Sequence, residues 1–147
     1  LELAKYFLNS FGIKILKTSN FYRTRSWPNK KFPDFFNIIL LVSTYLSLSE
    51  LFYKTKYIEK ILGRTKSPKN YPRVCDIDII DYNGTNKELK KKNQKIIVPH
   101  KNMHKRNFVL IPLYEINKNW IHPKSKKNIV KLITSLPIND LRSIKIN

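Results

Sequence analysis

Apolar residues recur along the chain at two spacings, three to four residues apart in some stretches and two apart in others. The first spacing is typical of helices and the second of strands. Helices are predicted over residues 1–11, 47–62 and 125–136, with further helical segments over 101–116. Strands are predicted over 13–24, 34–45 and 74–82, followed by a short extended piece over 95–98.

Helix and turn signals mark the ends of these elements. Gly12 and Gly63 follow the first two helices, as glycine commonly does at a helix C-terminus. Ser47 and Glu50 have the spacing of a capping box at the start of the second helix. Loops are predicted over 25–33 and 64–73, and the polar stretch 85–94, after an Asn-Gly turn, is predicted to be a solvated excursion.

The strands over 13–24 and 34–45 follow each other across one loop, which favours an antiparallel pair. Helices packed on a mainly antiparallel sheet form an α+β sandwich, and this is the fold class we expect. No internal repeat or boundary is visible, so we expect one domain over residues 1–147. Leu1 already lies inside a helical pattern, from which we expect the chain to be truncated at its N-terminus.

The charge balance narrows the possible partners. The 147 residues include 29 Lys and Arg against 10 Asp and Glu, a net charge of +19, which attracts polyanions. A hydrophobic fraction of 41% argues against disorder. The single cysteine, Cys75, excludes an intramolecular disulfide framework and a Cys-based zinc site. The longest apolar stretch, 35–42, is far shorter than the roughly 20 residues of a membrane span.

The clearest chemical feature is an acidic pair, Asp76 and Asp78, on the predicted strand 74–82. Alternate side chains of a strand share a face, so both carboxylates point to one side while Cys75, Ile77 and Ile79 point to the other. Two carboxylates at this spacing can hold Mg²⁺ together with waters and substrate phosphates. The alternative is an ordinary solvent-facing edge of a strand.

Cationic residues suited to phosphate surround this pair in the sequence. Arginine presents a planar fork that fits phosphate oxygens, and a site with two acids, several arginines and a histidine is what metal-assisted phosphoryl transfer requires. Surface ion pairing is the alternative for each cation taken separately. No P-loop motif is present. The candidate cations are Arg64, Lys66, Arg73, His100 and Arg106.

An ordered set of motifs resembles the 6-hydroxymethyl-7,8-dihydropterin pyrophosphokinase (HPPK) family over roughly residues 1–136. The blocks that carry the resemblance are S-N-F-Y-R-T (19–24), P-D-F-F-N (33–37), I-E (58–59) with G-R (63–64), P-R-V-C-D-I-D-I (72–79), V-P-H (98–100) and R-N-F-V-L-I-P-L (106–113). The resemblance implies a ferredoxin-like α+β fold. It also implies transfer of pyrophosphate from ATP to 6-hydroxymethyl-7,8-dihydropterin with release of AMP, in folate biosynthesis.

The resemblance also implies a role for each matching residue. Asp76 and Asp78 match the carboxylates that hold two Mg²⁺ ions, and Arg64 and Arg73 match residues that act in catalysis. The pterin site is implied to comprise Thr24, Phe35, Asn37 and Phe108. The ATP site is implied to comprise Lys56, Glu59, Arg64, Lys66, Arg73, Ile79, Lys95, Ile97, His100 and Arg106. Loops 25–31 and 66–71 are expected to close over the substrates.

The sequence departs from the family pattern at its start, where a strand and a G-S-N turn are missing. Two alternatives therefore stay open: an inactive truncated paralogue that binds ligands, and a basic ferredoxin-like RNA-binding module. On the resemblance we expect a cytoplasmic monomer whose partners are ATP and the pterin, with no membrane or nucleic-acid partner.

Overall fold

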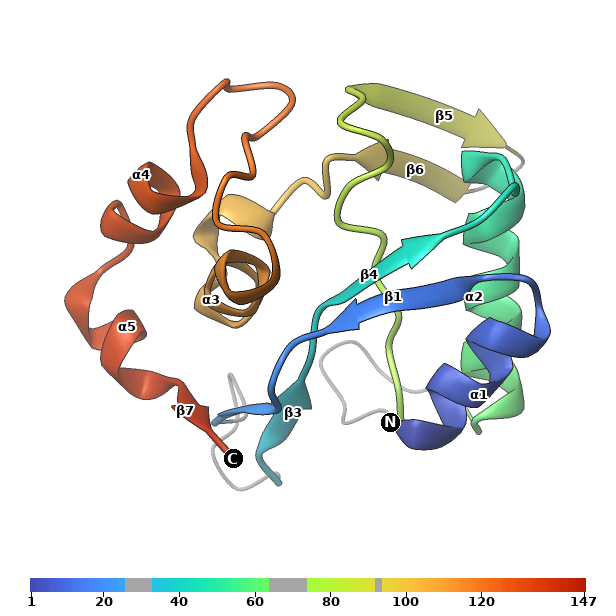
Figure 1. Ribbon diagram of the computed structural model, residues 1–147, viewed down its shortest axis with the longest axis horizontal. Helices are drawn as coiled ribbons and strands as arrows, with labels where there is room; N and C mark the ends of the chain where they lie inside the picture. Colours follow the sequence, from blue (N-terminus) through green and yellow to red (C-terminus); the bar gives the residue numbers. More distant parts are fainter. Residues whose placement is uncertain (26–32, 64–73, 92–93) are drawn as a thin grey trace.

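A computed structural model describes residues 1–25, 33–63, 74–91 and 94–147. Helices and antiparallel strands mix in an α+β fold, as expected (Figure 1). The helices are α1 (Glu2–Ser10), α2 (Leu48–Ile61), the 3-10 helix η1 (Met103–Lys105), α3 (Asn107–Ile116), α4 (Ile129–Thr134) and α5 (Ile138–Ser143). The strands are β1 (Lys14–Thr18), β2 (Tyr22–Thr24), β3 (Phe35–Asn37), β4 (Leu40–Ser43), β5 (Lys87–Lys91), β6 (Gln94–Val98) and β7 (Lys145–Ile146).

The predicted antiparallel pair is present, but each long strand is divided in two. β1 pairs with β4 and β2 pairs with β3, and β7 adds to the free side of β2. The interruption has a local cause. The Ser19 hydroxyl accepts the Ile39 N–H at 2.9 Å, and the Asn20 N–H turns away to the Glu115 carboxylate. Side-chain oxygens thus accept backbone N–H groups that would otherwise donate to a neighbouring strand, and the strand pairing stops there.

The structure corrects both sequence predictions for residues 74–91. Residues 74–82 run extended without forming a strand of any sheet in the described ranges; Figure 1 draws them as a yellow-green trace leading to β5. Residues 87–91, predicted as a solvated excursion, instead form β5 and pair with β6. An ion pair between Lys95 and Glu88, with 2.8 Å between the ammonium and the carboxylate, links the two strands. The sequence pattern did not predict β5, because neither face of this polar strand carries an apolar stripe.

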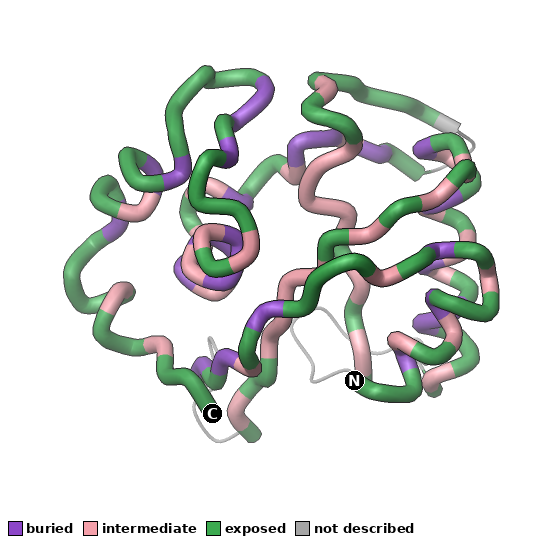
Figure 2. The backbone as a smooth tube through the Cα atoms, viewed as in Figure 1, coloured by how far each residue is buried: buried purple, intermediate pink, exposed green. Residues whose placement is uncertain are grey.

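The first two helices follow the prediction closely. The Ser47 side chain accepts the Glu50 N–H while the Glu50 carboxylate accepts the Ser47 N–H, which confirms the capping box. Gly63 takes a φ of +90° just after α2, a backbone conformation that glycine adopts without strain. Buried residues of α1 and α2 pack with Ile13, just before β1, and with Leu40 and Val42 of β4, and Figure 2 shows buried positions on both helices.

A second core lies around α3 and α4, where Met103, Leu110 and Ile129 are fully buried. α4 is shorter than the predicted helix 125–136. The His122 ring accepts the N–H groups of Lys124 and Ser125, and Lys126 has a φ of +57°, so a helix does not begin there. α5 and β7 follow, and neither was predicted.

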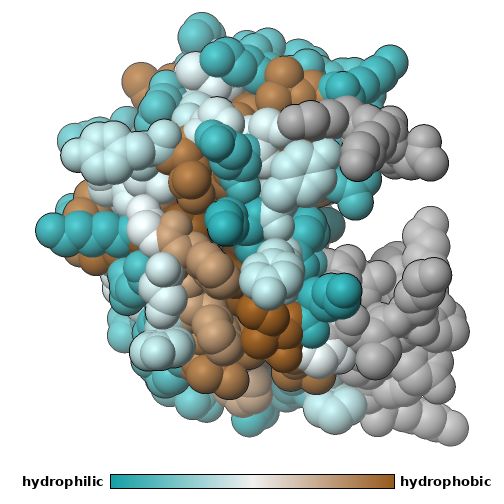
Figure 3. All heavy atoms as spheres, turned by 90° about the vertical axis from the view of Figure 1, so that its right-hand side faces the viewer, coloured by the Kyte–Doolittle hydropathy of each residue, from teal (hydrophilic) through white to brown (hydrophobic). Residues whose placement is uncertain are grey.

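Apolar side chains also gather on the face that α1 and α2 present in Figure 3. The exposed residues Leu1, Leu3, Ile61 and Val74 line a hollow at this end of the fold. Among the residues that the structure describes, none of those lining the hollow belongs to the predicted site. Within the described ranges, no helix combines the length and the apolar character needed to cross a bilayer.

Candidate active site

The acidic segment, residues 74–82, carries its side chains alternately outward and inward. Asp76 and Asp78 are exposed, while Cys75, Ile77 and Ile79 are partly buried. This is the alternation expected for an extended backbone, although no strand ladder holds it. In the part of the chain that the structure describes, no three His, Cys, Asp or Glu side chains group as metal ligands. A cation at the acidic pair would therefore need further oxygen ligands from water or phosphate, which is how Mg²⁺ is commonly held.

Two nitrogen-bearing side chains, Arg106 and His100, approach the same carboxylate oxygen of Asp78. Arg106 Nη1 lies 3.4 Å from Asp78 Oδ2, and His100 Nε2 lies 3.8 Å from the same oxygen. The His100 backbone N–H donates to the Ile80 carbonyl at 2.9 Å, which ties this turn to the acidic segment. Asp78 is still 46% exposed, so its carboxylate remains accessible to a ligand.

The surroundings of His100 favour its neutral form. Burial lowers the pKa of His100 below its ordinary value, Arg106 and Lys56 lower it further, and Asp78 acts in the opposite direction. The Nδ1 atom accepts the Asn102 N–H at 3.3 Å. In the neutral imidazole this bond assigns the proton to Nε2, the nitrogen nearest Asp78. His100 can therefore donate one hydrogen bond into the site.

Arg106 joins the acidic segment to an aromatic ring. Its guanidinium carbon lies 5.6 Å from the ring centre of Phe108, while Nη1 faces Asp78. Phe108 is partly buried on α3 and packs against the core that also contacts Ile80. A phosphate-type cation, a carboxylate and an aromatic face thus meet at the N-terminal end of α3.

The β2–β3 pair carries the other predicted ring-binding residues. Thr24 lies opposite Phe35 and Tyr22 lies opposite Asn37 in the register. The Asn37 amide donates to Thr24 Oγ1 at 3.1 Å, which orients it. Phe35 is 36% exposed, and its i, i+2 spacing with Asn37 puts both side chains on one face of β3.

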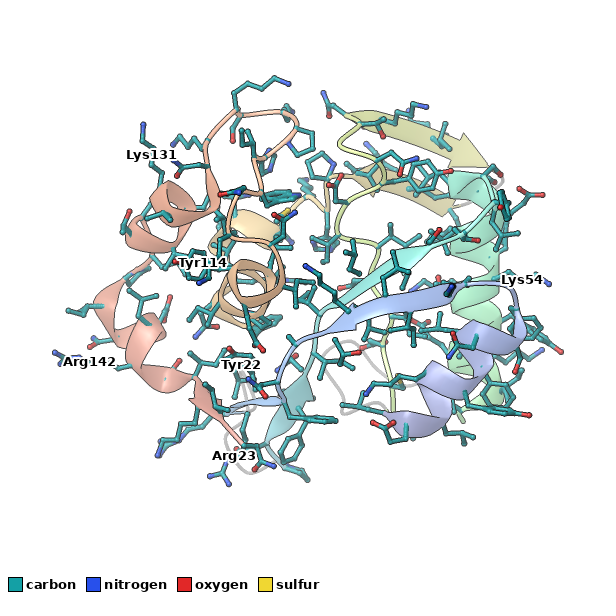
Figure 4. The ribbon with its side chains drawn as sticks, viewed as in Figure 1. Tyr22, Arg23, Lys54, Tyr114, Lys131 and Arg142 are labelled. Carbon is teal, nitrogen blue, oxygen red and sulfur yellow. The ribbon has the colours of Figure 1, made fainter. Side chains whose placement is uncertain are left out.

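Glu115 fastens this strand pair to α3. Its carboxylate accepts the Tyr22 hydroxyl at 2.9 Å and the Asn20 backbone N–H at 3.0 Å. Figure 4 labels Tyr22 where β2 approaches α3. Burial first, and then the bond to Glu115, raises the pKa of Tyr22 to about 12. The sequence prediction missed this link, because nothing local relates positions 93 residues apart.

Lys56 and Glu59 lie on α2 beside the acidic segment. Glu59 is fully buried, although it is a carboxylate. Its Oε1 accepts the Ile77 N–H and the Lys56 ammonium, each at 2.7 Å. A helical plot could have indicated this burial, because Glu59 is spaced with Thr55 and Ile58 on the stripe that faces the core.

Three of the predicted ATP-site residues, Ile79, Lys95 and Ile97, divide between two faces. Ile79 packs against the cluster of Leu48, Ile96 and Val98. Lys95 and Ile97 alternate with these β6 residues and so lie on the opposite face of the strand. The Lys95 ammonium pairs with Glu88 at 2.8 Å. Three further predicted residues, Arg64, Lys66 and Arg73, lie outside the described residues, as does most of the two predicted closing loops.

Comparisons with known proteins match most of the chain. A family model described as 7,8-dihydro-6-hydroxymethylpterin-pyrophosphokinase (HPPK) matches residues 1–118. A 2-amino-4-hydroxy-6-hydroxymethyldihydropteridine pyrophosphokinase of Aquifex aeolicus is 36% identical over 115 residues, which are 78% of this chain and 69% of that protein. One of the same name from Synechocystis is 35% identical over 122 residues, 83% of this chain and 60% of that protein.

A longer relative also matches. The folic acid synthesis protein fol1 of Pneumocystis carinii is 33% identical over 133 residues, which are 90% of this chain. The chain spans 17% of the length of that protein, against 60% of the Synechocystis protein.

Proposed function

The chain belongs to the 7,8-dihydro-6-hydroxymethylpterin-pyrophosphokinase family, and from this membership we propose that it transfers pyrophosphate from ATP to 6-hydroxymethyl-7,8-dihydropterin. In this reaction the hydroxymethyl oxygen of the pterin attacks the β-phosphorus of ATP. The bond from that phosphorus to the oxygen of the α-phosphate breaks, AMP leaves, and the hydroxyl proton passes to solvent. The product is a pterin diphosphate of the folate pathway.

One observation supports this proposal above the others: Arg106 contacts both Asp78 and the ring of Phe108. A reaction between a triphosphate and a planar heterocycle requires a polar, charged region beside an aromatic one. Arg106 connects these two regions in a single side chain. An RNA-binding surface would need exposed aromatic residues without acidic residues among them, because carboxylates repel phosphates. The exposed Asp76 and Asp78 oppose that alternative.

Asp76 and Asp78 would hold two Mg²⁺ ions, since paired carboxylates supply the hard oxygen ligands this cation prefers. When bound, Mg²⁺ neutralises triphosphate charge and lowers the pKa of the attacking hydroxyl. His100, through its Nε2 proton, and Arg106, through its guanidinium, donate to phosphate oxygens as charge shifts toward the leaving AMP. We also assign phosphate contacts to Arg64, Lys66 and Arg73.

The pterin would bind between Phe35 and Phe108, because flat heterocycles are well held between aromatic faces. Asn37 reads the ring edge with its amide, which Thr24 orients. Ile79, Lys95 and Ile97 are assigned to the adenine end of ATP.

The decisive test is an assay for AMP with purified protein, MgATP and the reduced pterin. We expect AMP and the pterin diphosphate to appear in equal amounts, and no AMP without the pterin. Tight binding of both substrates with no AMP would show a ligand-binding paralogue and overturn the transfer activity. Binding of RNA at physiological salt without binding of MgATP would favour the RNA module instead.

Replacing Phe35 with alanine is expected to raise the KM for the pterin about tenfold, the equivalent of one stacking contact. The KM for ATP should stay unchanged. Phe36→Ala is the matched control, because Phe36 is exposed on the opposite face of the same strand and should leave both constants unaltered. Equal effects of the two substitutions would contradict the assignment of Phe35 to the pterin site.

A further inference from the structure

Glu59 is a carboxylate at 0% exposure in the last turn of α2. Burying such a group is costly unless charged or polar partners compensate it. The fold tolerates this burial at a position that faces the acidic segment, where an apolar residue would satisfy packing alone. The contacts that compensate the charge therefore indicate what the residue does.

Glu59 and its ion-pair partner Lys56 both contact the backbone of Ile77. The Ile77 N–H donates to Glu59 Oε1 at 2.7 Å, and the Lys56 ammonium donates to the Ile77 carbonyl at 3.3 Å. Lys56 also donates to Glu59 at 2.7 Å. Because Lys56 and Glu59 are three residues apart on α2, their side chains are neighbours and form one ion-paired unit. This unit engages both polar groups of a single backbone residue.

Ile77 is the residue between Asp76 and Asp78. In an extended backbone, the orientation of one residue sets the direction of the side chains on either side of it. The acidic segment belongs to no strand ladder in the described ranges, so the contacts from α2 replace the bonds a neighbouring strand would supply. His100 adds a further backbone bond at Ile80.

We propose that Glu59, with Lys56, is a positioning residue that aims the Asp76 and Asp78 carboxylates at a bound divalent cation. Glu59 acts through the backbone of Ile77, because its buried carboxylate has no access to solvent. This role goes beyond the nucleotide contact expected for Glu59 and rests on the proposed metal-binding function of the two aspartates.

The test compares Glu59→Gln with Glu50→Gln. Both substitutions remove one carboxylate from α2, but Glu50 belongs to the capping box at the start of the helix. The probe is Mn²⁺ with α,β-methylene ATP, whose bond between the α- and β-phosphates is not cleaved, measured by electron paramagnetic resonance. We expect Glu59→Gln to weaken Mn²⁺ binding by about tenfold or more, as loss of a group behind a metal ligand does. Glu50→Gln should leave that affinity unaltered.

Hydrogen exchange at the Ile77 amide gives a readout independent of metal. Its rate should increase in Glu59→Gln and not in Glu50→Gln, at matched thermal stability. Lys56→Met serves as a second variant should Glu59→Gln fold poorly, because Lys56 is partly exposed. We expect it to weaken Mn²⁺ binding as well, by a smaller factor.

Unchanged Mn²⁺ affinity in folded Glu59→Gln, or equal losses in Glu59→Gln and Glu50→Gln, would overturn the positioning role. The proposed function is tested separately by AMP release from the unaltered protein. Absence of AMP together with weaker Mn²⁺ binding in Glu59→Gln would overturn the reaction and support the positioning role.

Discussion

Replacing Asp78 with asparagine is expected to lower turnover by about a thousandfold or more, and Asp76→Asn should have an effect of the same order. Asparagine keeps the shape of the side chain but removes the negative charge that would hold Mg²⁺. Because both aspartates are exposed, the fold should remain intact. The measurement is the rate of AMP release at saturating MgATP and pterin, with thermal unfolding recorded for each variant.

Asp81→Asn is the matched control, since Asp81 lies on the same segment. Its carboxylate accepts the Trp120 indole N–H at 2.9 Å and the Gly84 N–H at 3.2 Å. Loss of this charge-assisted acceptor should lower the melting temperature and leave turnover nearly unchanged. Normal turnover in both Asp76→Asn and Asp78→Asn would remove the basis for a metal site on this segment.

Arg106→Met is expected to reduce kcat/KM by about a hundredfold, a loss typical of a group that stabilises developing charge. Arg106 lies 3.4 Å from Asp78 and over the Phe108 ring, so its removal affects both ends of the proposed site. Arg106→Lys keeps the charge without the planar fork and should give an intermediate value. Separate kcat/KM values for ATP and for the pterin measure the effect.

Lys105→Met separates this local role from the overall positive charge of the protein. Lys105 is exposed, directly precedes Arg106, and its replacement removes the same unit of charge. We expect its kcat/KM values to equal those of the unaltered protein. A comparable loss in Lys105→Met would mean that attraction of ATP to a basic surface accounts for the effect of Arg106.

The periodicity of the sequence predicted some elements accurately and failed at others for identifiable reasons. α1 and α2 were predicted to within one residue at most ends because their apolar stripes and glycine stops are local signals. The extended piece predicted over 95–98 is present as β6, but its partner β5 was missed because this lysine-rich strand carries no apolar alternation. Residues 74–82 alternate as a strand does, yet an extended backbone becomes a strand only when another backbone pairs with it.

The candidate site was also predicted in part: its residue types came from the sequence, but their contacts came from the structure. The sequence identified Asp76, Asp78 and Arg106 as candidates from motif and spacing, and the structure brings Arg106 and Asp78 together at 3.4 Å. The assignment of Glu59 to the nucleotide site stays a prediction, and only the structure shows that its carboxylate is buried and accepts the Ile77 N–H. A residue type and its spacing indicate what chemistry is available. They do not indicate whether the side chain faces solvent or a neighbouring backbone.

By itself, the sequence determined the family, the α+β class, the antiparallel pairing and the alternation that turns the two aspartates outward. These follow from motifs and from patterns within one element, where neighbours along the chain are neighbours in space. Only the tertiary structure decided that α2 holds the acidic segment through Ile77 and that Glu115 ties α3 to Tyr22. These bonds join residues 18 and 93 positions apart, and packing of separate elements brings such groups within hydrogen-bond distance.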